Sequence, residues 1–263
     1  MLPESDRVLY KKNPLVEVIC QLRFPTILRI REGHLADFQD RIRKDYPIYT
    51  LQEPSIDIPQ LPKELATMLE RVNIAIPGGQ SVHKFSTADS TRFISLSQDF
   101  LAVAEINYER WETFRAEIER AERSLREIYD PAFYSRVGLR YRNVISRQLL
   151  GIADVAWQDL LQPHITAELG DKALSSSVVK TQTSAIIRIP EIAGAQIMLI
   201  HGLTKQQGSE ENCYGIDADF SIARKEGIHE PFELLDKFNR LAGRLFSWAI
   251  TKKLHNAMEP RPI

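Results

Sequence analysis

The chain has 263 residues, of which 43% are hydrophobic and 26% are charged. These fractions are typical of globular proteins and exclude a disordered, collagen-like or disulfide-scaffold chain. The 34 Lys and Arg residues and 35 Asp and Glu residues leave a net charge of −1, so no overall field attracts the protein to nucleic acid or to an anionic membrane.

The first half of the chain predicts a strand, a short helix, several strands and a long helix. Apolar and polar residues alternate over 16–24, which predicts a strand, and apolar residues recur every three or four positions over 35–42, which predicts a short helix. Prolines within 53–63 indicate an extended connector. Short strands are expected at 72–76, 82–87, 92–97 and 100–107. A narrow apolar stripe then predicts a helix over 111–128.

The second half of the chain repeats this order of elements. Alternation predicts a strand over 135–145, and the next apolar cluster predicts a short helix over 154–163. Three more strands are expected at 176–190, 195–203 and 214–223. A second long helix is expected to begin at Pro231, because the first position of a helix needs no backbone N–H donor, and its apolar stripe reaches Ala249.

The repeated order predicts an α+β fold made of two similar strand–short helix–antiparallel strands–long helix repeats. Leu22-Arg23-Phe24 recurs as Leu139-Arg140-Tyr141, and the period is about 115–120 residues. We therefore divide the chain into 1–131 and 132–263, with one integrated unit as the alternative. In this pseudo-twofold unit the two long helices pair about the axis and cover an antiparallel sheet.

The chain lacks the motifs of several common enzyme classes. It contains no Walker A loop, dinucleotide-binding glycine motif, HExxH or GxSxG sequence. Its six histidines are scattered, and Cys20 and Cys213 lie far apart, which disfavours structural zinc and suits a reducing cytosol. We found no signal-peptide core and no apolar run long enough to span a bilayer. These features favour a cytoplasmic, non-catalytic protein and leave any cofactor unidentified.

Two predicted strands carry charged residues opposite their apolar faces. Asp217 and Asp219 share one face, about 7 Å apart. They could bind a divalent metal, pair with arginines or simply face solvent. Arg136, Arg140 and Arg142 share one face of the strand 135–145 and could grip a phosphate or carboxylate. Alternatively, these arginines pair with acidic residues of neighbouring strands, which would stabilise the sheet.

The predicted strand over 16–24 also has a polar face, formed by Glu17, Gln21 and Arg23. If the repeat holds, Arg23 and Arg140 occupy equivalent positions and would face the two aspartates in a central polar cluster. Such a cluster could bind a ligand or could only fix the register of the strands.

Five segments resemble a sporadically distributed prokaryotic family of uncharacterised proteins of about this length. They are NPLVEVICQLRF at 13–24, FLAVAEINYERWETF at 100–114, RVGLRYRNVI at 136–145, YGIDADF at 214–220 and the terminal helix running into Phe246. The resemblance implies a cytosolic bacterial or archaeal protein whose gene moves between genomes, as partners in defence or toxin–antitoxin cassettes often do. It supplies no catalytic residue. The positions to consider first are Glu17, Arg23, Arg140, Asn143, Asp217 and Asp219.

Three functions follow from these features. The leading hypothesis is a non-catalytic protein–protein interaction module, an accessory or neutralising subunit of such a cassette, which predicts an exposed apolar patch. The alternative is a protein that binds a small anionic ligand, or a metal-dependent enzyme. Its cavity would lie between the sheet and the long helices. The ligand-binding residues would be Glu17, Arg23, Arg140, Arg142 and Asn143, with Asp217 and Asp219 on a cation. A third hypothesis is RNA or DNA binding through the strand 136–147, which the near-neutral charge disfavours. A homodimer is compatible with all three.

Overall fold

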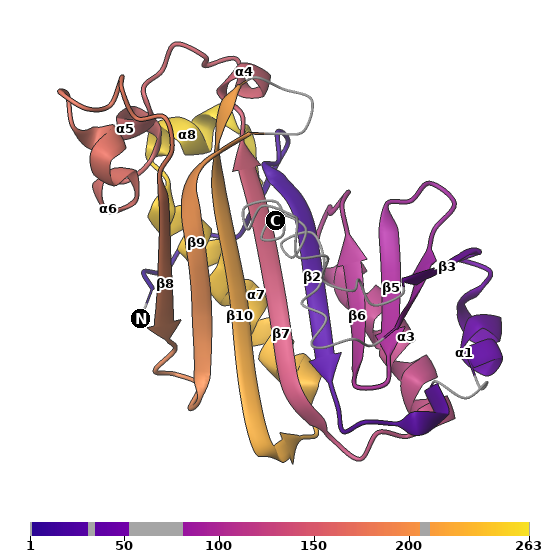
Figure 1. Cartoon of the computed structure of the whole chain (residues 1–263). Coiled ribbons are helices and arrows are strands. Elements are labelled where there is room, and N and C mark those ends of the chain that lie inside the picture. The colour runs from indigo at the N-terminus through magenta and orange to yellow at the C-terminus, as the bar shows by residue number, and fades with distance from the viewer. Residues whose placement is uncertain (1, 31–34, 53–80, 206–210, 263) are drawn as a thin grey trace, which may run out of the picture.

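The computed structural model describes residues 2–30, 35–52, 81–205 and 211–262. One antiparallel sheet dominates this part of the chain. Its strands are β2 (Leu15–Arg23), β3 (Ile48–Gln52), β4 (Val82–Ser86), β5 (Arg92–Ser97), β6 (Phe100–Glu105), β7 (Tyr134–Ile145), β8 (Gln182–Arg188), β9 (Ala195–Lys205) and β10 (Asn212–Ile228). The order across the nine-stranded sheet is β3-β4-β5-β6-β2-β7-β10-β9-β8 (Figure 1).

Two 19-residue helices, α3 (Trp111–Tyr129) and α7 (Pro231–Ala249), pack against this sheet. Shorter helices are α1 (Leu35–Ile42), α4 (Arg147–Leu150), α5 (Trp157–Leu160), α6 (Pro163–Thr166) and α8 (Lys252–Ala257), with 3-10 turns η1 (Leu28–Ile30) and η2 (Ala167–Gly170). Helix α7 contacts β7 and β10, and α3 contacts β6 (Figure 1). No helix in the described ranges is both long and apolar enough to cross a membrane.

The alternation of apolar and polar residues determines which face of the sheet is buried. Val137 and Leu139 of β7 are fully buried, and they belong to the same core cluster as Phe238 of α7 and Ile118 of α3. Neighbouring residues of a strand point to opposite faces, so the arginines of β7 lie on the face away from α7. The sheet runs without interruption from the first half of the chain into the second, because β2 pairs with β7.

Short elements differ most from the sequence predictions. The predicted helix over 154–163 is wrong as a single element, because α5 and α6 are separated by Leu161, which has an extended backbone and forms a bridge to Ile250. The strand expected from 176 begins only at Gln182, and β10 is longer than predicted. The predicted connector 53–63 and strand 72–76 lie outside the described residues.

The N-terminal and C-terminal segments meet in a small second sheet. Strand β1 (Val8–Tyr10) pairs with β11 (Pro260–Pro262) in antiparallel register. The pairing continues beyond the strands, because Lys11 N–H donates to the Glu259 carbonyl and Lys12 N–H donates to the Met258 carbonyl. These bonds hold the residues before β2 close to the C-terminal end of α7 and thereby position one wall of the cavity described below.

Candidate functional site: a cavity beside the long C-terminal helix

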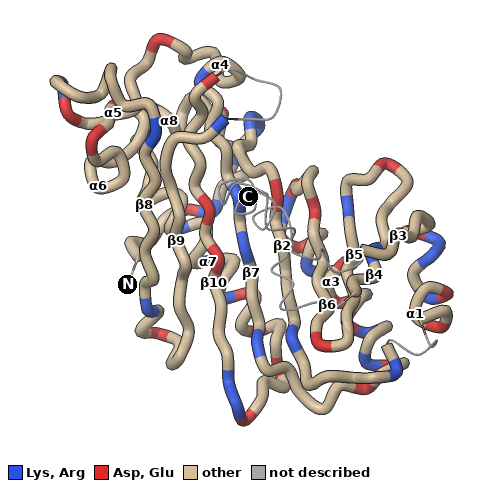
Figure 2. Tube along the Cα trace, in the orientation of Figure 1, with Lys and Arg blue, Asp and Glu red and all other residues tan. Residues whose placement is uncertain are grey.

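Charged side chains of β2, β7 and β10 pair with one another on the sheet face away from α7. Figure 2 shows where charged residues occur along these strands. We call this set the charge ladder; it consists of Glu17, Gln21, Arg136, Arg140, Arg142, Asp217 and Asp219. Arg140 binds Asp217 with two hydrogen bonds, of 2.8 Å from Nε and 2.5 Å from Nη2. Burial alone would lower the pKa of Arg140, but the hydrogen bonds and charge of Asp217 raise it above its ordinary value.

The other two arginines of the charge ladder also bond to side chains of neighbouring strands. Arg142 Nη1 lies 2.7 Å from Glu17 Oε2. Arg136 donates to Asp219 over 2.8 Å and to Gln21 over 2.9 Å. The interpretation that these arginines pair with acidic residues across the sheet is therefore confirmed, and a ligand would have to displace one of these partners.

Gly138 provides the space that Arg136 needs to reach Asp219. A Cβ atom at Gly138 would lie 2.4 Å from Nη1 of Arg136, which is closer than non-bonded atoms approach. The guanidinium of Arg136 therefore lies over Gly138, the residue that separates Arg136 from Arg140 on this face of β7. This contact explains why a residue without a side chain interrupts the row.

Arg23 does not join the central cluster predicted for it, and that expectation is wrong. Arg23 pairs in register with Arg136 at the end of β2, whereas Arg140 lies opposite Ile19. The antiparallel pairing places Arg23 four residues along the strand from the level of Arg140, or roughly 14 Å. Its guanidinium instead lies 3.9 Å from Asp99, in the turn between β5 and β6.

The predicted metal and nucleic-acid sites gain no support from this geometry. Asp217 and Asp219 are each bonded to an arginine, and no group of three or more metal-ligating side chains occurs in the part of the chain that the structure describes. Metal binding by the two aspartates remains a prediction. Arg147, beyond the ladder, donates to the Val155 carbonyl and stacks over Trp157, so this strand presents no unpaired row of arginines to a phosphate backbone.

Removing one member of the ladder is expected to destabilise the protein without affecting the cavity. Arg140→Met should lower the free energy of unfolding by about 1.5 kcal/mol, because the half-buried Asp217 loses its bidentate partner. The double variant Arg140→Met/Asp217→Leu should recover most of this loss. Urea unfolding measures both, with Arg41→Met as the control: it breaks an exposed ion pair with Glu127 and should cost less than about 0.5 kcal/mol. A double variant no more stable than Arg140→Met would contradict this assignment.

A cavity of about 300 Å³ lies on the opposite face of the sheet, beside α7. Residues 5–10, which we call the N-terminal strap, form one wall, and α7 forms another. The lining comprises residues 5–10, Asn13, Leu15, Tyr108, Glu109, Trp111, Tyr141, Asn143, Asn239, Arg240, Ala242, Gly243, Arg244, Phe246 and Ser247. The site therefore combines segments from both ends of the chain with the middle of the sheet.

Of the residues predicted to surround a ligand, this cavity contains only Asn143. Glu17, Arg140 and Arg142 do not line it, so the expectation that they face a cavity under the long helices is wrong. The physical reason is the alternation of β7: Tyr141 and Asn143 point toward α7, and the two arginines beside them point away. Helix α7 packs on the apolar face, which leaves the ladder on the other side.

The floor of the cavity contains a hydrogen-bonded pair formed by the buried Tyr141 and the partly buried Asn239. The Tyr141 hydroxyl donates to Oδ1 of Asn239 over 2.9 Å. Burial raises the pKa of Tyr141 well above its ordinary value, so the phenol stays protonated and remains a donor. Tyr108 packs edge-on against Tyr141, with ring centroids 6.0 Å apart. The amide nitrogen of Asn239 keeps its two N–H groups for other acceptors.

The N-terminal strap is held in place by the side chains of Arg7 and Tyr10. Tyr10 Oη lies 2.9 Å from His255 Nδ1, and Tyr10 packs edge-on against Phe246. Arg7 Nη1 lies 2.6 Å from Glu112 at the start of α3. The hydrogen bond from Arg7 lowers the pKa of Glu112 to about 2. The strap is therefore a specifically bonded wall, although its bonds lie near the surface.

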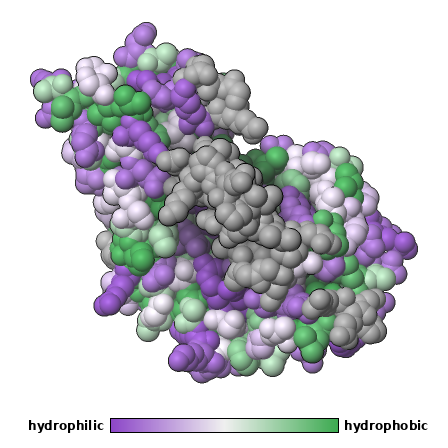
Figure 3. Space-filling view, viewed as in Figure 1, coloured by the Kyte–Doolittle hydropathy of each residue, from purple (hydrophilic) through white to green (hydrophobic). Residues whose placement is uncertain are grey.

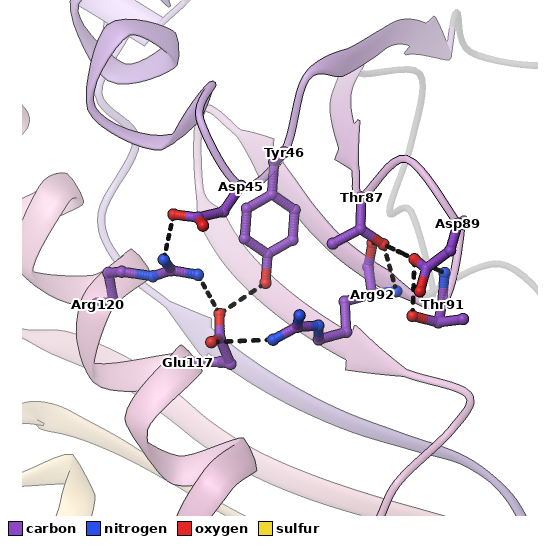
Figure 4. Close-up of polar contacts among 8 residues, drawn as sticks. All are labelled: Asp45, Tyr46, Thr87, Asp89, Thr91, Arg92, Glu117 and Arg120. Atoms are coloured by element: carbon purple, nitrogen blue, oxygen red, sulfur yellow. Dashed lines mark hydrogen bonds and ion pairs between the residues drawn. The ribbon is translucent and has the colours of Figure 1, made fainter.

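A second charged cluster ties α3 to the first half of the sheet (Figure 4). Tyr46 donates to Glu117 over 2.9 Å, and Arg92 Nη1 lies 3.0 Å from the same carboxylate. Arg120 pairs with both Glu117 and Asp45. These groups satisfy one another and lie at no cavity described above, so we assign them a structural role.

Sequence reasoning missed most of the cavity. Asn239, Arg240 and Gly243 lie on the polar side of a helix whose apolar stripe drew attention to the core, and the strap precedes the first predicted element. Gly243 is the one sequence feature that could have indicated the cavity, because glycine is unfavourable inside a helix. In the structure, the absence of a side chain at this position leaves open space beside the cavity.

No protein-family model matches the chain, and no curated protein matches it. The resemblance of the five sequence segments to a prokaryotic family therefore remains a prediction, together with the genomic context that it implies. The function has to be argued from the geometry of the cavity.

Proposed function

We propose that the protein binds a small molecule in the cavity between β7, α7 and the N-terminal strap, without transforming it. The observation that carries this proposal is the cavity itself, whose floor contains Tyr141, Asn143 and Asn239 among apolar and aromatic walls. Its volume of about 300 Å³ is at the lower end of the range for small-molecule sites. A few polar groups in a mostly apolar concavity are the usual composition of such sites.

Filling the cavity from α7 tests this proposal. A Cβ atom at Gly243 meets no atom within 4 Å, and replacing a helical glycine improves helix propensity, so Gly243→Phe should fold at least as stably as the wild type while occupying part of the cavity. Native mass spectrometry of protein gently purified from its own host should reveal a small-mass adduct that Gly243→Phe lacks.

The matched control is Lys237→Phe, an exposed substitution on the same helix outside the cavity. It should keep the adduct. An adduct that persists in Gly243→Phe, or a wild-type protein that carries none, would count against the proposal. Circular dichroism of both variants checks that the helix content is unchanged.

A second candidate function is protein binding through β3, as an accessory or neutralising subunit would require. Among the described strands, β3 lies at the edge of the sheet. Its Ile48, Tyr49 and Leu51 are 43%, 41% and 43% exposed. An edge strand offers unpaired backbone groups to a strand of a partner, and apolar side chains add affinity. Figure 3 shows hydrophobic residues at several places on this face of the described chain. The other edge strand, β8, exposes Ile186 (63%), whereas β3 exposes three large hydrophobic side chains within four residues, so we favour β3.

Introducing a charged residue into β3 tests protein binding without altering the ligand cavity. Leu51→Lys should abolish a stoichiometric complex with another polypeptide in native mass spectrometry, because an exposed lysine on an edge strand opposes strand pairing. Lys44→Leu, also exposed and just before the strand, should leave such a complex intact. A complex that survives Leu51→Lys would exclude β3 as the docking strand.

We also propose that the two halves are structural repeats related by a pseudo-twofold axis between β2 and β7. Support comes from the strand order, which reads β2-β6-β5-β4 outward on one side and β7-β10-β9-β8 on the other, with β3 added beyond β4 on the first side only. A 19-residue helix follows β6 on one side and β10 on the other. A crystal structure in which residues 15–129 fail to superpose on residues 134–249 would contradict the repeat.

A further inference from the structure

We infer that the ligand of this cavity is an aromatic anion, with its carboxylate or phosphate held by Arg240 and Arg244 and its ring placed among the aromatic walls. This inference rests on the proposed function and adds the chemical class of the ligand. It is carried by three features: two neighbouring guanidinium groups on α7, asparagine side chains that offer hydrogen bonds from the floor and a wall rich in aromatic rings.

The two arginines lie one helical turn apart on the cavity side of α7. Arg240 and Arg244 both line the cavity, and like charges four residues apart on a helix repel each other. Arg244 has a carboxylate within reach, but Glu4 lies 3.4 Å away and its side chain is 92% exposed, so this contact is weak. Guanidinium groups bind carboxylates and phosphates through planar, bidentate hydrogen bonds. An anion between them would relieve their repulsion and replace Glu4.

Acidic residues also line the cavity, but on other elements. Asp6 belongs to the strap and Glu109 to the segment before α3; both are exposed to solvent, as is Arg240, whereas Arg244 is partly buried. The third cation, Arg7, already binds Glu112 over 2.6 Å. The positive side of the cavity is therefore the α7 side, which orients an anion toward Arg240 and Arg244.

Asn239 adds a donor rather than an acceptor to the floor. Oδ1 of Asn239 already accepts from the Tyr141 hydroxyl, so the amide nitrogen is the group that Asn239 can offer to a ligand. Asn239 and the two arginines all line the cavity, but neighbouring residues of a helix point in different directions, so the amide would contact a different part of the ligand from the anionic group. Asn143, which also lines the cavity, offers both a donor and an acceptor.

The walls and the volume suit a single aromatic ring. The aromatic side chains in the lining are Tyr10, Tyr108, Trp111, Tyr141 and Phe246. Aromatic rings favour offset or edge-to-face contact with other rings, as Tyr10 and Phe246 already show with centroids 5.9 Å apart. A volume of about 300 Å³ is at the lower end of the range for small-molecule sites, which suits a ligand built on a single aromatic ring with one acidic group.

Four probes that share one ring and differ in charge test the inference. Benzoate, phenyl phosphate, benzyl alcohol and benzylamine are titrated against the full-length wild-type protein by ligand-observed NMR at millimolar concentration. Both anions should bind more tightly than the neutral alcohol, and the cationic amine should bind most weakly. The comparison of benzoate with phenyl phosphate then shows which anion the two arginines prefer.

Two charge-removing variants locate the anion. Arg240→Gln and Arg244→Gln should each weaken binding of the anions about tenfold, since a hydrogen bond to a charged group is lost, while binding of benzyl alcohol stays unchanged. Arg123→Gln removes an exposed arginine from α3, far from the cavity lining, and should change neither. Equal loss of all probes in Arg240→Gln would show a structural effect and overturn the assignment.

The outcomes separate this inference from the proposed function. If the alcohol or the amine binds as tightly as the anions and Gly243→Phe abolishes that binding, the cavity is a ligand site but its ligand is not an anion. If the anions bind equally well to Gly243→Phe, the cavity is not the site and both proposals fail. If none of the four probes binds to the wild type, the inference is wrong, and the adduct experiment alone decides the proposed function.

Discussion

Replacing Gly202 with alanine is expected to lower the free energy of unfolding by about 3 kcal/mol. Gly202 lies in β9 with a φ of +155°, and a Cβ atom there would approach the Thr181 carbonyl oxygen to 2.1 Å. That carbonyl accepts the backbone hydrogen bond from Leu203. An added methyl group would therefore strain the backbone of β9 and also displace the chain where it enters β8.

A matched glycine in the same hairpin separates the strain from the clash. Gly194, in the turn between β8 and β9, has a φ of +82° but no atom within 4 Å of an added Cβ. Gly194→Ala should cost only about 1 kcal/mol, the typical penalty of a positive φ for alanine. Chemical denaturation of both variants gives the comparison. Equal losses of stability in the two variants would mean that the chain before β8 shifts readily to make room for the methyl group. The clash at Gly202 would then contribute little.

The second large effect is a pH-dependent loss of stability due to Glu105. This side chain, at the end of β6, is only 8% exposed, and burial raises its pKa from 4.5 to about 7. Arg92, opposite in register, directs its guanidinium to Glu117 instead (Figure 4). Glu117 and Glu109 raise the pKa further by repulsion, whereas the charge of Arg92 lowers it.

The sign of the effect follows from the raised pKa. The folded state holds the Glu105 proton more tightly than the unfolded state, so this contribution is complete below about pH 4.5 and is lost as the pH rises through 7. Between pH 5 and pH 8 the wild type should lose about 2 kcal/mol relative to Glu105→Gln, which cannot ionise there. Urea unfolding of both proteins at the two pH values measures this difference.

A variant of an exposed acidic residue controls for general charge effects. Glu233→Gln, on the solvent side of α7, should follow the wild type at both pH values within about 0.5 kcal/mol. If Glu105→Gln also follows the wild type, then Glu105 ionises normally in the folded protein. In that case the charge of Arg92 offsets the effect of burial on Glu105.

Much of the local structure could be predicted because it depends on neighbours in the sequence. Alternation placed β2 and β7 within a residue or two of their observed ends, and apolar stripes placed α3 and α7 with similar accuracy. The same alternation put the arginines of β7 on one face, and complementary charges identified their acidic partners. Short elements such as β3 and α8 escaped prediction because few residues of periodicity define them.

The candidate site could not be predicted in the same way. The sequence by itself determined which residues are strand, helix or core, since propensity and periodicity act over a few neighbouring positions. The cavity depends on contacts between distant segments: Tyr10 meets His255, Arg7 meets Glu112, and Tyr141 meets Asn239. Only the tertiary structure decided that α7 packs on the face bearing Asn143 and that the strap closes one side. The reason is that the strand order and the meeting of the two ends of the chain are properties of the packed sheet, not of any local pattern.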